Sequence, residues 1–198
     1  LRGDFKQSEY GKVVLPFVVL RRLDCLLENS KQAVLEAEKT LPENADEATR
    51  DMILFGAVGG NVKVYNLSRF TFESLKGQDP GQLHQNLIDY ITRFSPNVRD
   101  IFLDKFRFTD QLKRLKDGGI LWNVFERFCE VDLHPEIISN IEMGYLFEEL
   151  IRRFSEISNE TAGEHFTPRE VIRLIVDLLI ANDDAKLTGR GIIRQVYD

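Results

Sequence analysis

The sequence predicts a mainly α-helical protein that changes to an α/β architecture near its C-terminal end. Over most of residues 9–157, apolar residues recur at the three- and four-residue spacing of one helix face. Two of these stretches open with Asp or Ser followed by Pro, an order that is typical of a helix start. A further helical stretch is then followed by an apolar run at 192–197 that is typical of a strand, which predicts the change of architecture.

Two helices are predicted over residues 9–41. Apolar residues give one face to a helix over 9–27. Pro16 lies inside that stretch, so we expect it to kink the helix or to displace its start. A more polar helix follows over 28–41, and the break at 41–44 ends it.

Residues 42–78 carry the weakest pattern of the chain. Gly56, Gly59 and Gly60 argue against a long helix there. The run 62–65 fits either a short strand or simply extended chain. Phe70 and Phe72 alternate with polar residues, which also favours extended chain.

From residue 79 to residue 157 the pattern predicts a series of short helices. Asp79-Pro80-Gly81-Gln82 supplies an N-cap, a proline at the first helical position and a Gln at the third, and its helix runs to about Phe94. The later helices are expected from Ser95-Pro96, over 110–116 up to Gly118-Gly119, over 121–131, from Pro135, and over 143–157. Because helices of this length are marginal alone, they must pack on one another, so we expect residues 1–157 to form one helical domain.

The polar stretch 158–163 is a natural junction, after which residues 158–198 begin a second domain. Thr167-Pro168-Arg169-Glu170 is a capping box that opens a helix to about Ile180. As structure alone such a cap contributes about 1 kcal/mol. It also leaves backbone N–H groups that suit a carboxylate or a phosphate. By itself, a short motif of this kind is more often only a cap.

The charge balance argues against a stand-alone DNA-binding domain. The chain has 198 residues, 43% of them hydrophobic, and a formal net charge of −6. Most of the affinity for DNA comes from cationic contacts to phosphates, so an autonomous DNA-binding domain should be basic. The segment 99–116 carries six basic and three acidic residues. It fits a solvated helix face or, alternatively, a contact from residues such as Lys113 and Arg114 to DNA phosphates.

No metal site is expected from the cysteines and histidines. Cys25 and Cys129 lie far apart and form no metal-spaced pattern, so we expect reduced, mostly buried thiols in an intracellular protein. His84, His134 and His165 share no metal spacing with either cysteine.

No membrane segment is expected either. The longest apolar run, at 13–20, is too short to cross a bilayer, and no signal-peptide pattern surrounds it. Leu1 is not an initiator methionine, so we expect further residues upstream.

Several stretches resemble known families. Gly163-Glu164-His165-Phe166-Thr167-Pro168-Arg169, followed by an amphipathic helix, resembles motif X of amino-methyltransferases. The stretches 94–98, 132–135 and 140–154 are similar to stretches in the modification (M, HsdM) subunit of type I restriction–modification enzymes. The block 142–169 is the most specific part of this resemblance.

The resemblance implies an adenine-specific DNA methyltransferase that transfers a methyl group from S-adenosylmethionine to N6 of adenine in DNA. Residues 1–157 would be the helical N-terminal domain, which helps to clamp the duplex and contacts other subunits. Residues 158–198 would begin a Rossmann-like α/β methyltransferase domain, truncated at its first strand. The implied partners are a specificity subunit, a second modification subunit, restriction subunits and double-stranded DNA in the cytoplasm of a bacterium or archaeon.

The resemblance also assigns cofactor residues. They lie at the start of the second domain and at the end of the predicted strand: Glu164, His165, Phe166, Thr167, Pro168, Arg169 and Asp198. The family's glycine loop and its catalytic Asn-Pro-Pro-Phe/Tyr motif do not occur in the 198 residues, so we expect the chain alone to be inactive and to bind S-adenosylmethionine weakly or not at all. The alternative is a non-enzymatic helical protein-interaction module that happens to end in a capped helix.

Overall fold

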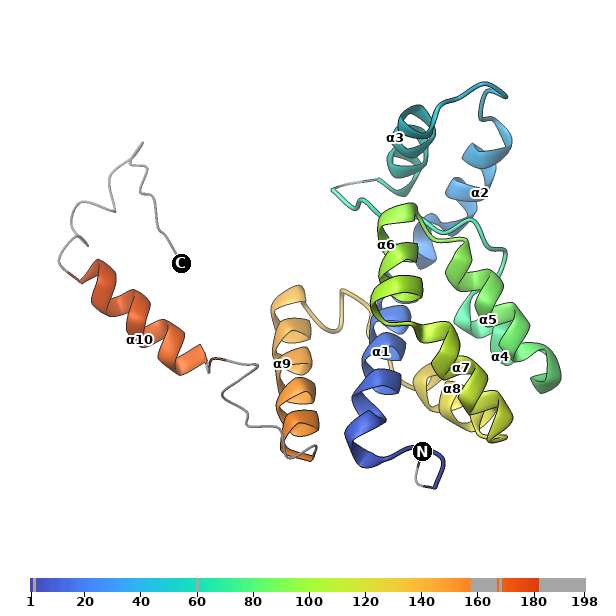
Figure 1. Ribbon diagram of the computed structural model, residues 1–198. Coiled ribbons are helices and arrows are strands. Elements are labelled where there is room, and N and C mark those ends of the chain that lie inside the picture. Colours follow the sequence, from blue (N-terminus) through green and yellow to red (C-terminus); the bar gives the residue numbers. More distant parts are fainter. Residues whose placement is uncertain (2, 60, 158–166, 168, 182–198) are drawn as a thin grey trace. The chain divides into compact units, whose positions relative to one another are not determined.

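The computed structural model describes residues 1, 3–59, 61–157, 167 and 169–181 (Figure 1). Within these residues it contains ten α-helices, several 3-10 turns and one π-helical turn, and no strand is formed there. The chain divides into two compact units, Leu1–Ser158 and Asn159–Asp198. The mainly helical class predicted from the sequence is therefore confirmed, whereas the strand predicted at 192–197 lies outside the described residues.

Helix α1 (Tyr10–Leu27) is central to the first unit and confirms the helix predicted over 9–27. It follows a 3-10 turn at Gln7–Glu9. Pro16 lies inside α1 and does not displace its start. The face that carries Val13 and Phe17 is fully buried. That burial outweighs the hydrogen bond that Pro16, which has no N–H, cannot donate.

Helix α2 (Lys31–Lys39) follows a 3-10 turn at Glu28–Ser30 and confirms the polar helix predicted over 28–41. Helix α3 (Glu47–Val58) corrects the expectation that glycines exclude a long helix from this region. Its N-terminus is capped by Asp46, whose Oδ1 accepts a hydrogen bond of 2.8 Å from the backbone N–H of Thr49.

The glycines of this stretch end α3 rather than prevent it. Gly56 lies within the last turns of the helix, where an added β-carbon would meet nothing within 4 Å. Gly59 then adopts φ +83°, a left-handed conformation that favours glycine and stops the helix. Helices α2 and α3 pack on each other around Val34, Leu54 and Tyr65.

Residues 62–65 have no regular secondary structure and do not form a strand. One antiparallel bridge follows them, between Asn66 and Phe94. The alternation of Phe70 and Phe72 was misleading, because Phe72 begins a short helix, α4 (Phe72–Lys76). A capping box between Thr71 and Ser74 starts this helix, and it overrides the alternating pattern.

The Asp79 signal is confirmed. Its Oδ1 accepts from the N–H of Gly81 at 3.1 Å, and a 3-10 turn at Pro80–Gln82 leads into α5 (Leu83–Thr92). Ser95 precedes helix α6 (Pro96–Asp100) but does not cap it. Its hydroxyl instead accepts a hydrogen bond of 3.4 Å from the backbone N–H of Tyr65, so Ser95 links Tyr65 to the start of α6.

Helix α6 continues into a π-helical turn at Ile101–Lys105, and α7 (Phe108–Asp117) follows. Arg107, between them, is the one described non-glycine residue with positive φ, at 46°. Gly118 and Gly119 end α7 as predicted, Gly119 with φ +69°. Helix α8 (Leu121–Cys129) then confirms the amphipathic pattern around Phe125.

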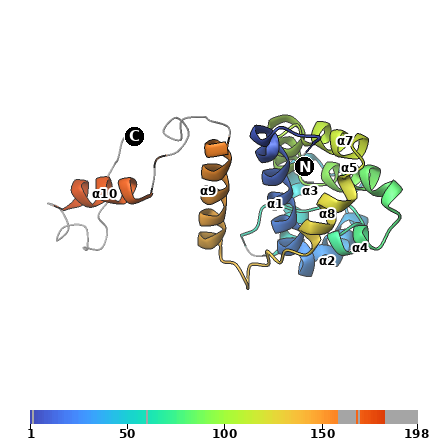
Figure 2. The same cartoon turned by 90° about the horizontal axis from the view of Figure 1, so that it is seen from below.

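A connection over 130–139 leads to helix α9 (Asn140–Ile157), which lies beside α1 in both views (Figures 1 and 2). Helix α9 confirms the helix predicted over 143–157, whereas the helical stretch expected from Pro135 is wrong, because residues 135–137 form only a turn. A capping box between Ser139 and Glu142 starts α9 instead.

Arg22 of α1 holds this connection in place. Its guanidinium donates to the carbonyl groups of Leu133 at 2.6 Å and Ile138 at 2.7 Å, and to Asn140 Oδ1 at 2.8 Å. These three bonds place the start of α9 against α1. Val18, Cys25 and Met143 are buried between the two helices.

The main core is aromatic and lies between α1 and helices α4, α5, α7 and α8. The ring of Phe17 stacks on Phe128, with centroids 4.8 Å apart, and meets the edge of Phe108 at 4.9 Å. Phe125 and Phe72 join the same core with centroids 4.9 Å apart. Aromatic pairs of this kind add about 0.5–1.5 kcal/mol each beyond the area they bury.

In the second unit, helix α10 (Arg169–Ile180) is described and confirms the helix predicted to about Ile180. Among the described residues, no helix is long and apolar enough to cross a membrane.

Candidate functional site

The structure describes two of the residues assigned to the cofactor segment. Thr167 is exposed and non-helical, and Arg169 is the first residue of α10. The chain therefore turns into a helix where the Thr-Pro-Arg-Glu motif predicts it. Glu164, His165, Phe166, Pro168 and Asp198 lie outside the described residues.

Helix α10 exposes an unusual amount of apolar surface. Each large apolar side chain from Val171 to Ile180 is between 38% and 68% exposed. A helix that is apolar on most of its surface belongs in a protein interior. The second unit therefore contains a helix suited to burial immediately after the candidate cofactor segment.

Ion pairs neutralise much of the basic segment 99–116. Lys113 Nζ lies 2.7 Å from Asp117 Oδ2, and Arg114 Nη1 lies 3.0 Å from Glu9 Oε1. The hydrogen bond from Arg114 lowers the pKa of Glu9 to about 2. Further pairs join Arg99 to Asp100 and Arg107 to Asp110. Paired charges on an exposed surface contribute little to stability and are partly unavailable for phosphates, which favours a solvated face for most of this segment.

A buried polar cluster beneath α1 was missed by the sequence analysis. Asp24, 9% exposed, accepts hydrogen bonds from the Tyr90 hydroxyl at 2.8 Å and the Phe72 N–H at 3.1 Å, and it pairs with Arg21 at 3.0 Å. Burial raises the pKa of Asp24 despite these partners, which act to lower it. The sequence signal that could have indicated this cluster is Asp24 itself, a charged residue among the apolar positions of α1.

Lys31 extends this cluster. Its Nζ donates to Asn66 Oδ1 at 2.9 Å and lies 5.3 Å from the centroid of the Tyr90 ring. Burial lowers the pKa of Lys31 to about 8. Because the groups of the cluster hydrogen-bond one another inside the core, we interpret the cluster as structural.

The cysteines and histidines form no metal cluster within the part of the chain that is described. Cys25 is buried and Cys129 half-buried, and both are free thiols, as expected. Burial raises the pKa of Cys129 to about 11 and raises that of Cys25 as well. His134 lies in the 130–139 connection, where its Nδ1 accepts from the Glu136 N–H at 3.3 Å. His165 lies outside the described residues.

Comparison with known proteins gives two family matches and one curated relative. Residues 1–128 match the HsdM N-terminal domain, and residues 139–191 match N-6 DNA Methylase. The chain is similar to the Type I restriction enzyme MjaIX methylase subunit of Methanocaldococcus jannaschii. The two are 24% identical over 189 residues, which cover 90% of this chain and 33% of that protein. The chain thus spans about a third of the relative's length. No solved structure matches.

Both family matches cover part of the first compact unit. Helix α9 falls within the N-6 DNA Methylase match, yet it packs against α1, which falls within the HsdM N-terminal match. The two matches thus follow one another along a single chain. The first match covers more than half of the residues of this chain, so the chain belongs to the HsdM N-terminal domain family.

Proposed function

We propose that this chain is the N-terminal part of a type I modification subunit that methylates N6 of adenine in DNA with S-adenosylmethionine. The observation that carries the proposal is the succession of an HsdM N-terminal match and an N-6 DNA Methylase match in one chain. The curated relative, named as a methylase subunit, supports it over nearly the whole chain.

In this proposal the chain contains two domains with different tasks. Residues 1–157 form the helical domain, which contributes to clamping double-stranded DNA and to assembly with the specificity, restriction and second modification subunits in the cytoplasm. Residues 158–198 begin the methyltransferase domain. The segment from Glu164 to Arg169, with Asp198, forms the edge of the cofactor site. The exposed apolar residues of α10 support the assignment of residues 158–198 to the start of an α/β domain, because a helix of this kind would be buried in a complete one.

The proposed chemistry of the cofactor segment rests on its helix start. The first N–H groups of α10 have no partner within the helix, and they suit the methionine carboxylate of S-adenosylmethionine. The hydroxyl of Thr167 stands beside them in sequence and is exposed. S-adenosylmethionine would supply the methyl group, while the residues of this segment would bind and orient its methionine end.

The test uses Thr167→Ala in the full-length subunit, with S-adenosylmethionine binding measured by calorimetry. Thr71→Ala is the matched control, because Thr71 caps α4 by accepting from the Ser74 N–H at 3.1 Å. Each substitution should cost about 1 kcal/mol of stability through its cap. Only Thr167→Ala should also weaken cofactor binding, by about tenfold for a lost hydrogen bond to a charged ligand. Equal cofactor affinity in the two variants would reduce Thr167 to a helix cap.

Methylation itself needs a separate measurement. The subunit, assembled with its specificity subunit, should transfer labelled methyl groups to adenine in duplex DNA. If the assembled complex transferred none, the chain would be left as a helical interaction module.

The alternative role of the segment 99–116, a contact with DNA phosphates, has its own test. If Lys113 exchanges its ion pair with Asp117 for a phosphate, Lys113→Glu should flatten the salt dependence of DNA binding by the assembled complex. An unchanged slope would exclude Lys113 from the phosphate contacts and favour the solvated face.

A further inference from the structure

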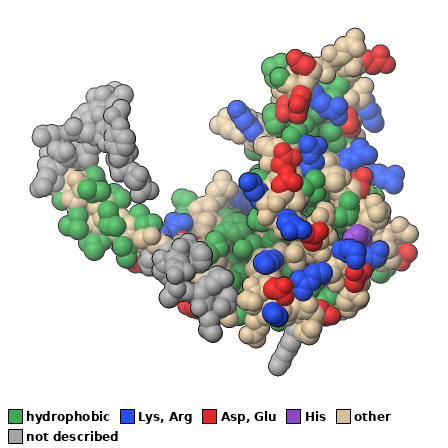
Figure 3. Space-filling model, viewed as in Figure 1, with side chains coloured by type: hydrophobic (Ala, Val, Ile, Leu, Met, Phe, Trp, Pro, Cys, Tyr) green, Lys and Arg blue, Asp and Glu red, His purple; other side chains and the backbone are tan. Residues whose placement is uncertain are grey.

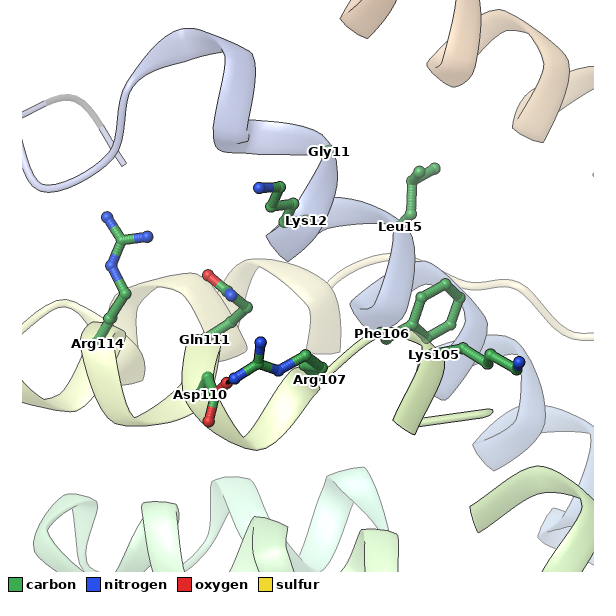
Figure 4. A pocket seen from close by; sticks show the side chains of 9 residues that line it. All are labelled: Gly11, Lys12, Leu15, Lys105, Phe106, Arg107, Asp110, Gln111 and Arg114. Carbon is green, nitrogen blue, oxygen red and sulfur yellow. Dashed lines mark ion pairs between the residues drawn. The ribbon is translucent and has the colours of Figure 1, made fainter. Parts of the chain in front are cut away.

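A pocket of about 550 Å³ lies in the first unit between α1 and the region that joins the π-helical turn to α7 (Figure 4). The consecutive residues Lys105, Phe106 and Arg107 all line it. In a regular helix, three consecutive side chains point about 100° apart and cannot face one cavity. The π-helical turn and the left-handed conformation of Arg107 therefore allow this segment to form the wall of the pocket.

The pocket is positively charged in a chain whose net charge is −6. Lys12, Lys105, Arg107 and Arg114 line it, against one acidic side chain, Asp110. Arg107 pairs with Asp110 and Arg114 with Glu9. Lys12 and Lys105 are exposed and form no ion pair within the part of the chain that the structure describes. Two lysines are therefore available to a ligand's negative charges.

The polar end of the pocket also lacks a donor. Gln111 Oε1 is buried and has no hydrogen-bond partner among the described residues. An unpaired buried acceptor is unfavourable, so a ligand that brings an N–H or O–H group would remove a penalty there. Leu15 and Phe106 lie together at the opposite end, beside Lys105 (Figure 4).

These three features distinguish between two classes of anionic macromolecule. The sugar–phosphate backbone of DNA offers acceptors but no donor for Gln111 Oε1, and no apolar side chain for Leu15 and Phe106. An acidic peptide offers carboxylates for Lys12 and Lys105, backbone N–H groups for Gln111, and apolar side chains for the other end.

We propose that this pocket binds an acidic, partly apolar peptide segment of a partner protein. Carboxylates of the segment pair with Lys12 and Lys105, a backbone N–H donates to Gln111 Oε1, and an apolar side chain packs on Leu15 and Phe106. The site is independent of the cofactor segment, so it stands or falls separately from the methyltransferase activity.

The test measures binding of a dye-labelled, end-blocked peptide, Gly-Asp-Glu-Leu-Asp-Glu-Gly, to the 198-residue chain by fluorescence anisotropy. The variant Lys12→Glu/Lys105→Glu should weaken binding at least about tenfold at low salt. Replacing the peptide's acids by Asn and Gln should do the same. The matched control is Lys39→Glu/Lys76→Glu, which makes the same charge change on exposed lysines of α2 and α4 and should leave binding unchanged.

Gln111→Leu tests the donor. It should lower the affinity for the peptide several-fold while the salt dependence of binding stays the same, because it removes an acceptor and no charge. Because Lys12 and Lys105 are exposed, their substitution should leave the fold intact, and thermal melting of each variant verifies this. If a glutamate variant melts early, Lys12→Gln/Lys105→Gln replaces it.

Three outcomes would overturn the proposal. One is no binding of the acidic peptide at millimolar concentration. Another is an equal loss in the control variant, which would show attraction by overall charge. The third is a short DNA duplex that displaces the peptide and shows the same sensitivity to Lys12 and Lys105, which would make DNA the occupant. Any of these can occur whether or not Thr167 binds the cofactor.

Discussion

At the scale of single residues, Asp24 joins three parts of the chain that are distant in sequence. It accepts from Phe72 and Tyr90, and Arg21, which pairs with it, lies 5.5 Å from the centroid of the Phe72 ring. A buried carboxylate is tolerable only when its acceptor sites are filled, so this network also fixes where α4 and α5 meet α1. Such a network could not be predicted, because nothing in the sequence near Asp24 identifies partners 48 and 66 residues away.

The lowered pKa of Lys31 predicts a pH-dependent stability. Between the folded pKa of about 8 and the reference value of 10.5, the unfolded chain holds a proton that the folded chain has lost. The free energy of unfolding therefore rises with pH in this window, by up to about 1.4 kcal/mol per pH unit. Below pH 8, Lys31 is charged in both the folded and the unfolded chain, and the cost of burying the cation remains.

Lys31→Met isolates this contribution. It keeps the apolar part of the side chain, and Asn66 Oδ1 still accepts from the Ser68 N–H at 2.8 Å. In urea unfolding at several pH values, the stability of the native protein relative to Lys31→Met should increase from pH 8 to pH 10. A difference that stays constant over this range would mean that Lys31 remains charged in the fold.

The raised pKa of Cys129 predicts a slow thiol. At about 11, against a reference value of 9.0, the thiolate at pH 8 is about 100-fold scarcer than in the unfolded chain. Reaction with a disulfide reagent should therefore be at least about 100-fold slower in the native protein than in guanidinium. The variant Cys129→Ser, which leaves only the buried Cys25, should react more slowly still. A fast native reaction would show that α8 opens readily.

At the scale of elements, the contact between α1 and α9 depends on the absence of a side chain at Gly11. A β-carbon there would lie 3.3 Å from the Phe154 ring, tighter than ordinary contact. Gly56 in α3 is the opposite case, since a β-carbon there would meet nothing within 4 Å. The two glycines thus allow backbone entropy to be separated from packing.

Gly56→Ala should raise the free energy of unfolding by about 0.5–1 kcal/mol, because alanine restricts the unfolded chain and favours the helix. Gly11→Val should lower it by about 1–3 kcal/mol, because Phe154 and α9 must shift away from α1. Urea unfolding monitored by circular dichroism measures both. Stabilisation by Gly11→Val would mean that α9 is not held tightly on α1.

Elements with a local signal were predicted, and those that depend on remote contacts were not. The Asp79 cap and the glycines after α7 act within a few residues, so the sequence located α5 and α7 well. The caps of Asp46 and Ser139 are equally local, but the sequence analysis did not identify them and followed Gly56 and Pro135 instead. Ser95 was misassigned because its hydroxyl serves Tyr65, which no local pattern indicates.

At the scale of the whole molecule, the candidate sites were predictable to different extents. The start of α10 follows from the Thr-Pro-Arg-Glu motif, and the roles of the residues around it stay a prediction. The pocket could not be foreseen, because Lys12 and Lys105 come from segments far apart in sequence, and the π-helical turn that presents Lys105 has no signature.

The three buried clusters lie entirely within the first unit, which predicts that it folds alone. A chain ending at Ser158 retains every residue of these clusters. Its thermal unfolding should remain cooperative, with a midpoint close to that of the full chain. Loss of the exposed apolar surface of α10 should also reduce self-association in analytical ultracentrifugation. A broad or absent transition would show that residues after 158 complete the core.

The central position of α1 has a consequence for how the protein is made. This helix leaves the ribosome before the other helices of the first unit, yet it packs against α7, α8 and α9, which are translated last in that unit. At about 5–20 residues per second, the buried face around Phe17 waits on the order of ten seconds for these partners. During that interval it is an apolar segment on a nascent chain, which makes α1 the natural place for a holding chaperone to bind.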